Sequence, residues 1–456
     1  MKAWICALCA IVFCVVLAGY SGHASAQNAA PVTPVTVQNL PSAASSAHPA
    51  ATAQTPFDPE KATDAYLATV SGKARAMSDS YFVGGYWLIL WDALYAIAVS
   101  ALLLWTKFSA RMRNFAQARV RSRFWQVPIY VIIYLIVTTV LTFPWSVYEN
   151  FIREHQYGLS NQNFWQWFGD FGTAFGVNLV VFTIIATVIY AFVRLTKDYW
   201  WVWGTLVSVV FAAILFMLGP VFVSPLFNHY YPLKDGPVKQ EILALARANQ
   251  IPATDVYEFD ASRQSKRISA NVSGFMGTTR ISMTDNLINR CNPREIVAVL
   301  GHEMGHYVLD HNAIGLTWFS ILFLVLFAFV NYGYRWLVGI FGGNWDVRTI
   351  DDPAGLPIAM ALVSFFFFVA TPITNTMTRT LEQQADTFGL NAARQPDGFA
   401  TVTLKLSEYR KLDPSPLEEF VFYDHPSGRT RIHGAMVWKA AHINDPDIVA
   451  GPKSPQ

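Results

Sequence analysis

The sequence predicts a predominantly α-helical, multi-span membrane protein with a polar domain that contains a small β-hairpin or sheet. Three observations support this prediction. Of the 456 residues, 53% are hydrophobic and only 14% are charged, whereas soluble domains carry about 25% charged residues. Six apolar segments are long enough to cross a hydrocarbon core of roughly 30 Å. The polar stretches between them contain a metal-binding helix motif and short strand-like segments.

Charge and cysteine content argue against a nucleic-acid-binding protein and against a fold held together by cysteines. The net charge is only +2, so nothing in the charge balance indicates a nucleic-acid partner. Three of the four cysteines lie in the first apolar stretch, and Cys291 stands alone. The chain therefore has neither a disulfide framework nor a cysteine cluster for a metal.

The N-terminus has the layout of a secretory signal. One lysine precedes a short apolar run, residues 4–20, and an Ala-Ser-Ala cleavage site follows at 24–26. Residues 1–26 are predicted to be a signal peptide, or a retained anchor because the run approaches the length of a span. Residues 27–76 are predicted to be an Ala-, Pro- and Ser-rich linker that ends in a short helix. This design fits the bacterial inner membrane.

Four apolar segments lie within residues 77–222, and two form a hairpin within residues 313–376. The segments cover residues 81–105, 125–147, 174–194, 199–222, 313–336 and 355–376. Tyr and Trp crowd several of their ends, as aromatic residues do at membrane interfaces. Asp92 lies inside the first segment. An acid there faces a cavity or a partner, or is buried against a Ser or Tyr side chain.

The charges of the connections predict an orientation. The 106–124 connection holds six Lys or Arg residues and no acid, so it is expected on the cytoplasmic side, whereas 148–173 has one Arg and three acids. By this count, the polar blocks 223–312 and 377–440 both emerge on the non-cytoplasmic side. Whichever way the chain is inserted, the transmembrane hairpin between these blocks leaves both on one side, where they can build one site.

The most informative motif is His302-Glu303-Met304-Gly305-His306, which reads H-E-x-x-H within an apolar run. The Asn-Pro-Arg-Glu sequence at 292–295 predicts the start of its helix with an N-cap, a first-turn proline and a capping glutamate. Histidines four apart share one helix face and can bind one Zn²⁺, while Glu303 can accept a proton from water. The alternative is a pair of core histidines beside a hydrogen-bonded glutamate.

Gly301 and Gly305 lie beside the two histidines, although glycine is a poor helix former. They indicate either that another element, such as the helix carrying the remaining metal ligand, packs close to this backbone, or that a buried helix simply tolerates glycine.

A two-histidine site needs a third protein ligand and an open position for water. The predicted helix 379–386 follows the sixth span directly. Its Glu382 and Asp386 lie on one face, which suits a metal ligand and a carboxylate that orients a ligating imidazole. A solvated helix face is the alternative interpretation. Other candidates for the third ligand are Glu295, Asp310 and His311, of which the last two lie on less suitable faces.

The polar block before the motif is mixed in character. Residues 240–249 are typical of an amphipathic helix, and 256–259 and 268–283 of short strands, with a turn at 276–279. A strand pair beside the metal-binding helix predicts an edge on which an extended peptide could add as another strand. The alternative is a structural hairpin without a ligand.

With these motifs, the chain resembles the integral-membrane CaaX prenyl endopeptidases, a gluzincin family of zinc metallopeptidases. The H-E-M-G-H motif and L-E-Q-Q-A-D at 381–386 carry the resemblance, together with three further stretches. These stretches are Pro225-Leu226-Phe227-Asn228 with Pro232, Leu233 and Gly236; Ser265-Lys266-Arg267 with Asn271; and His425-Pro426 with Arg431-Ile432. The similarity covers roughly residues 125–440 and is specific as a set.

The resemblance implies an H-E-x-x-H zinc metalloprotease domain, one Zn²⁺ per chain, and hydrolysis of peptide bonds by a zinc-activated water. His302, His306 and Glu382 would bind zinc. Glu303 would act as the general base and then as the acid toward the leaving amine.

The resemblance also assigns the residues around the metal. Asp386 would orient a metal ligand, and Asn271 would hydrogen-bond the substrate backbone. His425 and Arg431 would stabilise the oxyanion or bind the substrate main chain. The implied partners are the lipid bilayer and a peptide or protein substrate that is membrane-associated or lipidated. Residues 441–456 would be a tail.

Two features depart from the family pattern, and other functions stay open. The family has a ring of seven spans around a chamber, whereas this chain has six plus the 4–20 run. The catalytic side of family members is usually cytoplasmic, whereas the charge count places this site on the other side of the membrane.

The alternatives to a prenyl-endopeptidase function are a heat-shock-type membrane quality-control metalloprotease, a transporter or scaffold with structural zinc, and a catalytically inactive binding protein. A structural site commonly uses cysteine ligands, and only Cys291 is available.

Overall fold

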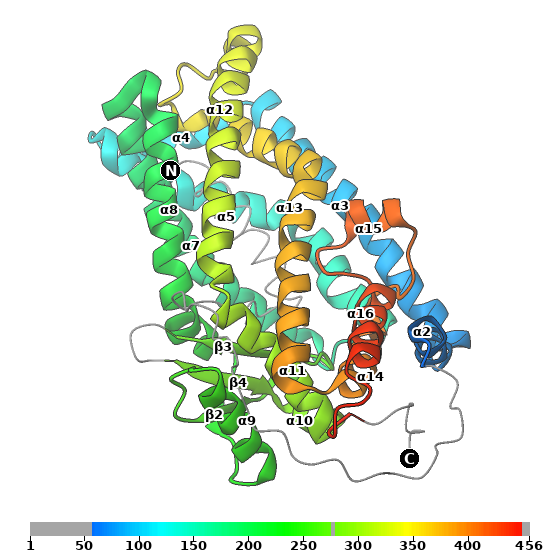
Figure 1. Ribbon diagram of the computed structural model, residues 1–456. Coiled ribbons are helices and arrows are strands. Elements are labelled where there is room, and N and C mark those ends of the chain that lie inside the picture. Colours follow the sequence, from blue (N-terminus) through cyan, green and yellow to red (C-terminus); the bar gives the residue numbers. More distant parts are fainter. Residues whose placement is uncertain (1–56, 275–278, 449–456) are drawn as a thin grey trace, which may run out of the picture.

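The computed structural model describes residues 57–274 and 279–448. The predicted signal, most of the predicted linker, residues 276–278 of the predicted turn and the second half of the predicted tail lie outside these residues. Within them, a bundle of long apolar helices carries a polar domain at one end (Figure 1).

Six long helices build the bundle, and each overlaps one of the predicted apolar segments, although several extend beyond it. They are α3 (Gly72–Trp105), α5 (Arg123–Val147), α7 (Phe164–Thr196), α8 (Trp200–Leu218), α12 (His311–Trp345) and α13 (Leu356–Ala393). Five helical stretches of the described residues are long and apolar enough to span a membrane, and Phe164–Phe216 is one of them. This stretch contains two helices, α7 and α8, which pack together on either side of a turn at Lys197.

The bundle has an apolar interior and an apolar outer surface. Tyr130, Phe323 and Phe327 are fully buried between the helices. Val140 and Ile321 are exposed although they are large and apolar. An apolar surface of this kind suits contact with lipid.

The predicted start of the membrane unit at residue 77 falls inside a helix. A short helix, α2 (Pro59–Ala68), packs against the C-terminal helix α16 (Gly428–Ala441), and α3 already begins at Gly72. The first turns of α3 are polar, with Lys73 and Asp79, so hydropathy alone did not include them in the helix.

The 106–124 connection is largely helical, because α4 occupies Phe108–Arg119. Its Arg113 is buried and forms ion pairs with Asp346 and Asp352 from the α12–α13 connection, each at 2.7 Å. One of the six cationic residues on which the orientation was predicted is therefore neutralised inside the protein.

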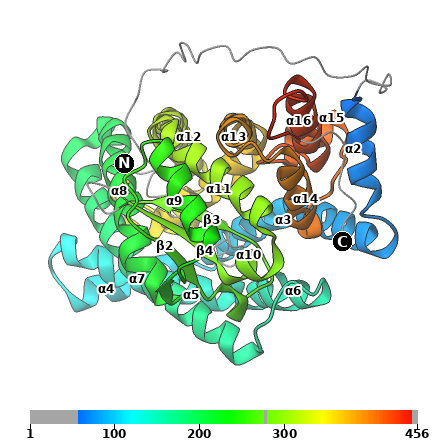
Figure 2. The same ribbon diagram turned by 60° about the horizontal axis from the view of Figure 1, so that its bottom comes forward.

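The polar domain combines a small mixed sheet with several helices (Figure 2). Its strands are β1 (Tyr230–Pro232), β2 (Val256–Phe259), β3 (Ala270–Ser273) and β4 (Arg280–Thr284). The strand order is β1-β2-β4-β3, with β2 and β4 parallel and the outer pairs antiparallel. The predicted strands are present, and β3 is an edge strand.

The helices of the polar domain surround the sheet and the end of α13. They are α6 (Arg153–Gln156), α9 (Pro237–Ala248), α10 (Asp285–Arg290), α11 (Pro293–Val308), α14 (Pro396–Leu406), α15 (Pro416–Phe422) and α16. α11 packs against β3 on one side and against α13 and α14 on the other. Ile242, Val256, Ile281 and Leu300 form the core beneath it. This position brings the two predicted polar blocks together around α11.

Candidate active site

The helix that carries the H-E-x-x-H motif begins as the sequence predicts. The Asn292 side chain accepts a hydrogen bond from the Glu295 backbone N–H at 3.1 Å, and Glu295 accepts one from the Asn292 N–H at 2.8 Å. Pro293 occupies the first helical position. This reciprocal cap satisfies two backbone donors and fixes the start of the helix. Glu295 also pairs with Lys405 at 2.6 Å, so it serves the cap rather than the metal site.

Three glycines let α11 and α13 approach backbone to backbone. A Cβ at Gly305 would lie 3.1 Å from the Ala385 Cα, and one at Gly389 would lie 2.8 Å from the His302 backbone nitrogen. A Cβ at Gly301 would lie 2.9 Å from the Ala393 Cβ. The expectation of a closely packed neighbour is confirmed, and this neighbour is the helix that carries Glu382.

His302, His306 and Glu382 converge into one buried group. The two His Nε2 atoms lie 3.2 Å apart, and Glu382 oxygens lie 3.2 Å from His302 Nε2 and 3.4 Å from His306 Nε2. Glu382 Oε2 is buried without a hydrogen-bond partner among the described residues. Two imidazoles and a carboxylate with an unsatisfied oxygen are the donor set of a catalytic metal site, so these residues fit a metal ion.

Each imidazole has a second partner behind it. His302 Nδ1 lies 2.8 Å from Asp386 Oδ1. Asp386 in turn accepts two hydrogen bonds from Arg431, at 2.5 and 2.9 Å. Arg431 is predicted to contact the substrate, yet its guanidinium is buried and bonded to Asp386. A guanidinium held by two hydrogen bonds to a carboxylate fixes that carboxylate, and through it the imidazole.

The second partner of His306 was not anticipated in this role. His311 Nδ1 lies 2.9 Å from His306 Nδ1, and His311 Nε2 lies 3.1 Å from Gln384 Oε1. Asp310, with φ of 52°, marks the turn between α11 and α12 that folds His311 back over His306. The sequence offers His311 as a ligand candidate, but this turn was not recognised from it.

Protonation in this cluster reflects burial and close pairing. Desolvation opposes the charged form of His302, but the adjacent carboxylates of Asp386 and Glu382 outweigh it and raise the pKa of His302 to about 10. Desolvation raises the pKa of Glu303 to about 7, although His302 and His306 act in the opposite direction. Glu303 keeps partial solvent exposure, as a group that exchanges protons with water requires.

His425 and Asn271 lie on different sides of the cluster. His425 Nε2 is 3.4 Å from Glu382 Oε2, while its Nδ1 is 2.9 Å from Asp424 and 3.3 Å from an Arg410 nitrogen. Asn271 lies on the edge strand β3, paired in register with Ser282 of β4. α11 packs against this strand, so Asn271 belongs to the surface beside the metal group and not to the group itself.

The bundle, the edge strand and the metal group together define a membrane-embedded metallopeptidase. Residues 232–438 match the model for peptidase family M48, and residues 60–229 match a model described as CAAX prenyl protease N-terminal, five membrane helices. The chain is 30% identical to the uncharacterized metalloprotease YhfN of Bacillus subtilis, over 73% of this chain and 79% of that protein. The chain belongs to peptidase family M48.

Further relatives agree with this assignment. A CAAX prenyl protease 1 homolog of Arabidopsis thaliana is 28% identical over 62% of this chain and 67% of its own length. The human CAAX prenyl protease 1 homolog is 23% identical, over 76% and 83%. The crystal structure of S. mikatae Ste24p has the same fold, with a TM-score of 0.68 at 20% identity, covering 83% of this chain and 94% of that one. The predicted family and fold class are confirmed, and the protein is an integral membrane peptidase.

Proposed function

We propose that this protein is a zinc-dependent endopeptidase that cleaves peptides at the membrane surface. The observation that carries the proposal is the convergence of His302, His306 and Glu382, with Glu303 on the same helix and an edge strand alongside. A structural zinc site is disfavoured, because such sites have four protein ligands and this group has three members among the described residues.

The residues present divide the work of peptide hydrolysis. His302, His306 and Glu382 would hold the ion, which when bound supplies Lewis acidity that polarises the scissile carbonyl and lowers the pKa of water toward about 7. Glu303 accepts a proton from the attacking water and delivers it to the nitrogen of the leaving amine. Its raised pKa is consistent with both accepting and releasing a proton near neutral pH.

Other residues hold the reactive groups in place. Asp386 orients His302, and Arg431 acts mainly through Asp386, because its donors already bind that carboxylate. His425, close to Glu382 and only partly buried, is the residue best suited to stabilise an oxyanion. Asn271 would hydrogen-bond the backbone of a substrate added along β3.

The substrate class and location follow from the same features. The site lies at one end of the membrane bundle, which favours peptides that are membrane-associated. Lipidated peptides belong to this class, as the names of the CAAX prenyl protease relatives indicate. We place the protein in the bacterial inner membrane with the metal site on the non-cytoplasmic side. Labelling of introduced cysteines from outside intact cells tests this orientation, and labelling only of the 106–124 connection would reverse it.

Peptidase activity of detergent-purified protein on an unmodified quenched-fluorescent peptide tests the function. Wild type should cleave, a chelator should abolish cleavage, and zinc should restore it. Glu241→Gln, an exposed acid on α9, is the matched control for Glu303→Gln. Cleavage that survives in Glu303→Gln would reject the proposed chemistry. A fully zinc-loaded protein that cleaves neither unmodified nor lipidated peptides would reject the function.

A further inference from the structure

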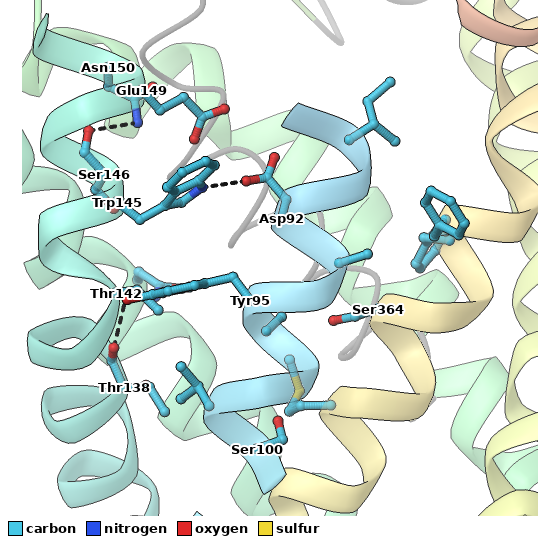
Figure 3. Close-up of a pocket in the computed structure, with 18 of the residues that line it drawn as sticks. Asp92, Tyr95, Ser100, Thr138, Thr142, Trp145, Ser146, Glu149, Asn150 and Ser364 are labelled. Carbon is cyan, nitrogen blue, oxygen red and sulfur yellow. Dashed lines mark hydrogen bonds between the residues drawn. The ribbon is translucent and has the colours of Figure 1, made fainter. Parts of the chain in front are cut away.

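A cavity of about 370 Å³ lies inside the membrane bundle, away from the metal group. Residues of α3, α5, α7 and α13 line it. Figure 3 shows Asp92 and Glu149 pointing toward one another near the Trp145 ring, with Tyr95 and Thr142 further along the cavity. Acidic side chains are costly at membrane depth unless they serve a ligand, a partner or a water-filled space.

Buried hydrogen-bond acceptors without a partner in the described part of the chain line this cavity. Asp92 accepts one hydrogen bond, from Trp145 Nε1 at 2.6 Å. Glu149 Oε2 and Asn178 Oδ1 are buried without a hydrogen-bond partner among the described residues. Asn178 is only 4% exposed and lines the cavity. Buried polar atoms are nearly always paired, so these oxygens indicate a missing donor.

Several donors around the cavity already bind backbone carbonyl groups of the protein. Tyr95 donates to the Leu141 carbonyl at 2.9 Å, Thr142 to the Thr138 carbonyl at 3.0 Å, and the Asn150 amide to the Ser146 carbonyl at 3.3 Å. Two charged residues that also line the cavity, Arg153 and Glu154, have contacts of their own within the protein.

The Arg153 guanidinium lies over the Tyr81 ring, 3.9 Å from its centre, and donates to the Tyr81 carbonyl. Glu154 pairs with Arg267 at 2.9 Å. Within the described residues, no ion pair involves Asp92 or Glu149, so a ligand that complements the cavity is cationic and rich in N–H donors.

We propose that this cavity binds the ammonium or guanidinium group of a basic side chain in the peptide substrate. The inference rests on the proposed endopeptidase function and adds a specificity determinant to it. Aromatic rings of Trp145 and Tyr95 beside the acids suit such a cation. The apolar lining accommodates the aliphatic part of a lysine or arginine.

The cavity is connected to the substrate-binding region by two elements. Glu154 lines the cavity and holds Arg267, which precedes the edge strand β3 by a few residues. Thr371 also lines the cavity and lies eleven residues before Glu382 on α13. This separation is roughly 16 Å along a helix, which about five residues of extended peptide can span. A basic residue about five positions from the scissile bond could therefore reach the cavity.

Peptide binding tests this inference without requiring catalysis. Zinc-loaded Glu303→Gln protein is placed in nanodiscs of phosphatidylcholine, and affinities are measured by fluorescence anisotropy. The probes are peptides in which a single lysine moves along the chain, each matched to a norleucine peptide. The lysine peptide should bind about tenfold more tightly at one position, the effect of one charge-assisted hydrogen bond. Adding Asp92→Asn and Glu149→Gln should abolish this preference and leave norleucine peptides unchanged.

Controls separate the possible results. Adding Asp198→Asn, an exposed acid at the α7–α8 turn, should preserve the preference. Equal binding of lysine and norleucine peptides at every position, or a preference that survives the double substitution, would overturn the proposal. Loss of the preference only when phosphatidylethanolamine is added would identify a lipid amine as the occupant and also overturn it. Failure of the endopeptidase function would appear separately, as absence of cleavage by wild type.

Discussion

The two polar clusters of this protein differ in how their groups are connected to one another. At the metal site, His302 and His306 face one another, and each ring contacts a further residue behind it, Asp386 or His311. In the membrane cavity, Glu149 and Asn178 each present a buried oxygen that lacks a hydrogen-bond partner in the part of the chain that the structure describes. The metal site is a tightly connected framework that could hold an ion, whereas the cavity provides acceptors and space. A substitution at the first should disturb a connected network, and one at the second should mainly change what binds.

The largest effect is expected from removing the proton acceptor at the metal site. Glu303→Gln preserves shape but cannot accept a proton, and general base catalysis contributes about 10²–10⁴-fold. We expect peptidase activity to fall by about 10³-fold while zinc content, measured by mass spectrometry, stays stoichiometric. Joint loss of zinc and activity would instead make Glu303 part of the framework that holds the ion.

The next effect concerns the support of His302. Asp386→Asn removes the charge that pairs with Arg431 and weakens the orientation of the ring. Changes to groups that support metal ligands lower metal affinity about 10–100-fold, and competition with a zinc chelator should show a loss in this range. Asp447→Asn, an exposed acid paired with Arg394, should leave affinity unchanged. An unchanged affinity in Asp386→Asn would mean that packing alone positions His302.

The motif residues could be predicted because their relationship is local. His302 and His306 are four residues apart on one helix, and Glu382 and Asp386 repeat that spacing on another. The topology of a transmembrane hairpin then required both helices to be on one side. The polar residues of the cavity had no such pattern, since Asp92 is on α3, Glu149 follows α5 and Asn178 is on α7. Packing of three helices brings them around one cavity, and neither periodicity nor spacing encodes that packing.

The close approach of α11 and α13 should be sensitive to a single methyl group. Gly389→Ala would place a Cβ 2.8 Å from the His302 backbone nitrogen, and overpacking of this kind costs about 1–3 kcal/mol. The melting temperature and zinc affinity should both fall. Gly434→Ala on α16 meets open space and should be neutral or slightly stabilising. If both variants had the same melting temperature and zinc affinity, α11 and α13 could move apart without loss of stability or metal binding.

The residue that supports His306 should matter less than the one that supports His302, because the His311 imidazole lacks the negative charge of the Asp386 carboxylate. His311→Phe retains a planar ring but removes the contact with His306 Nδ1 and with Gln384. We expect zinc affinity to fall by about tenfold, near the lower limit for such supporting groups. A loss of zinc affinity as large as that of Asp386→Asn would show that His311 and Asp386 support their histidines equally.

The smallest effect on stability is expected in the cavity, and it should differ in sign from those at the metal site. Asp92→Asn retains an oxygen that can accept from Trp145 Nε1 but removes a charge that has no ion-pair partner among the described residues. Neutralising an unpaired charge at low dielectric removes a desolvation cost. The melting temperature in detergent should therefore stay constant or rise, whereas that of Asp386→Asn should fall, since Arg431 then lies buried without its partner. A decrease of several degrees in Asp92→Asn would show that this acid stabilises the bundle and that its charge is compensated there.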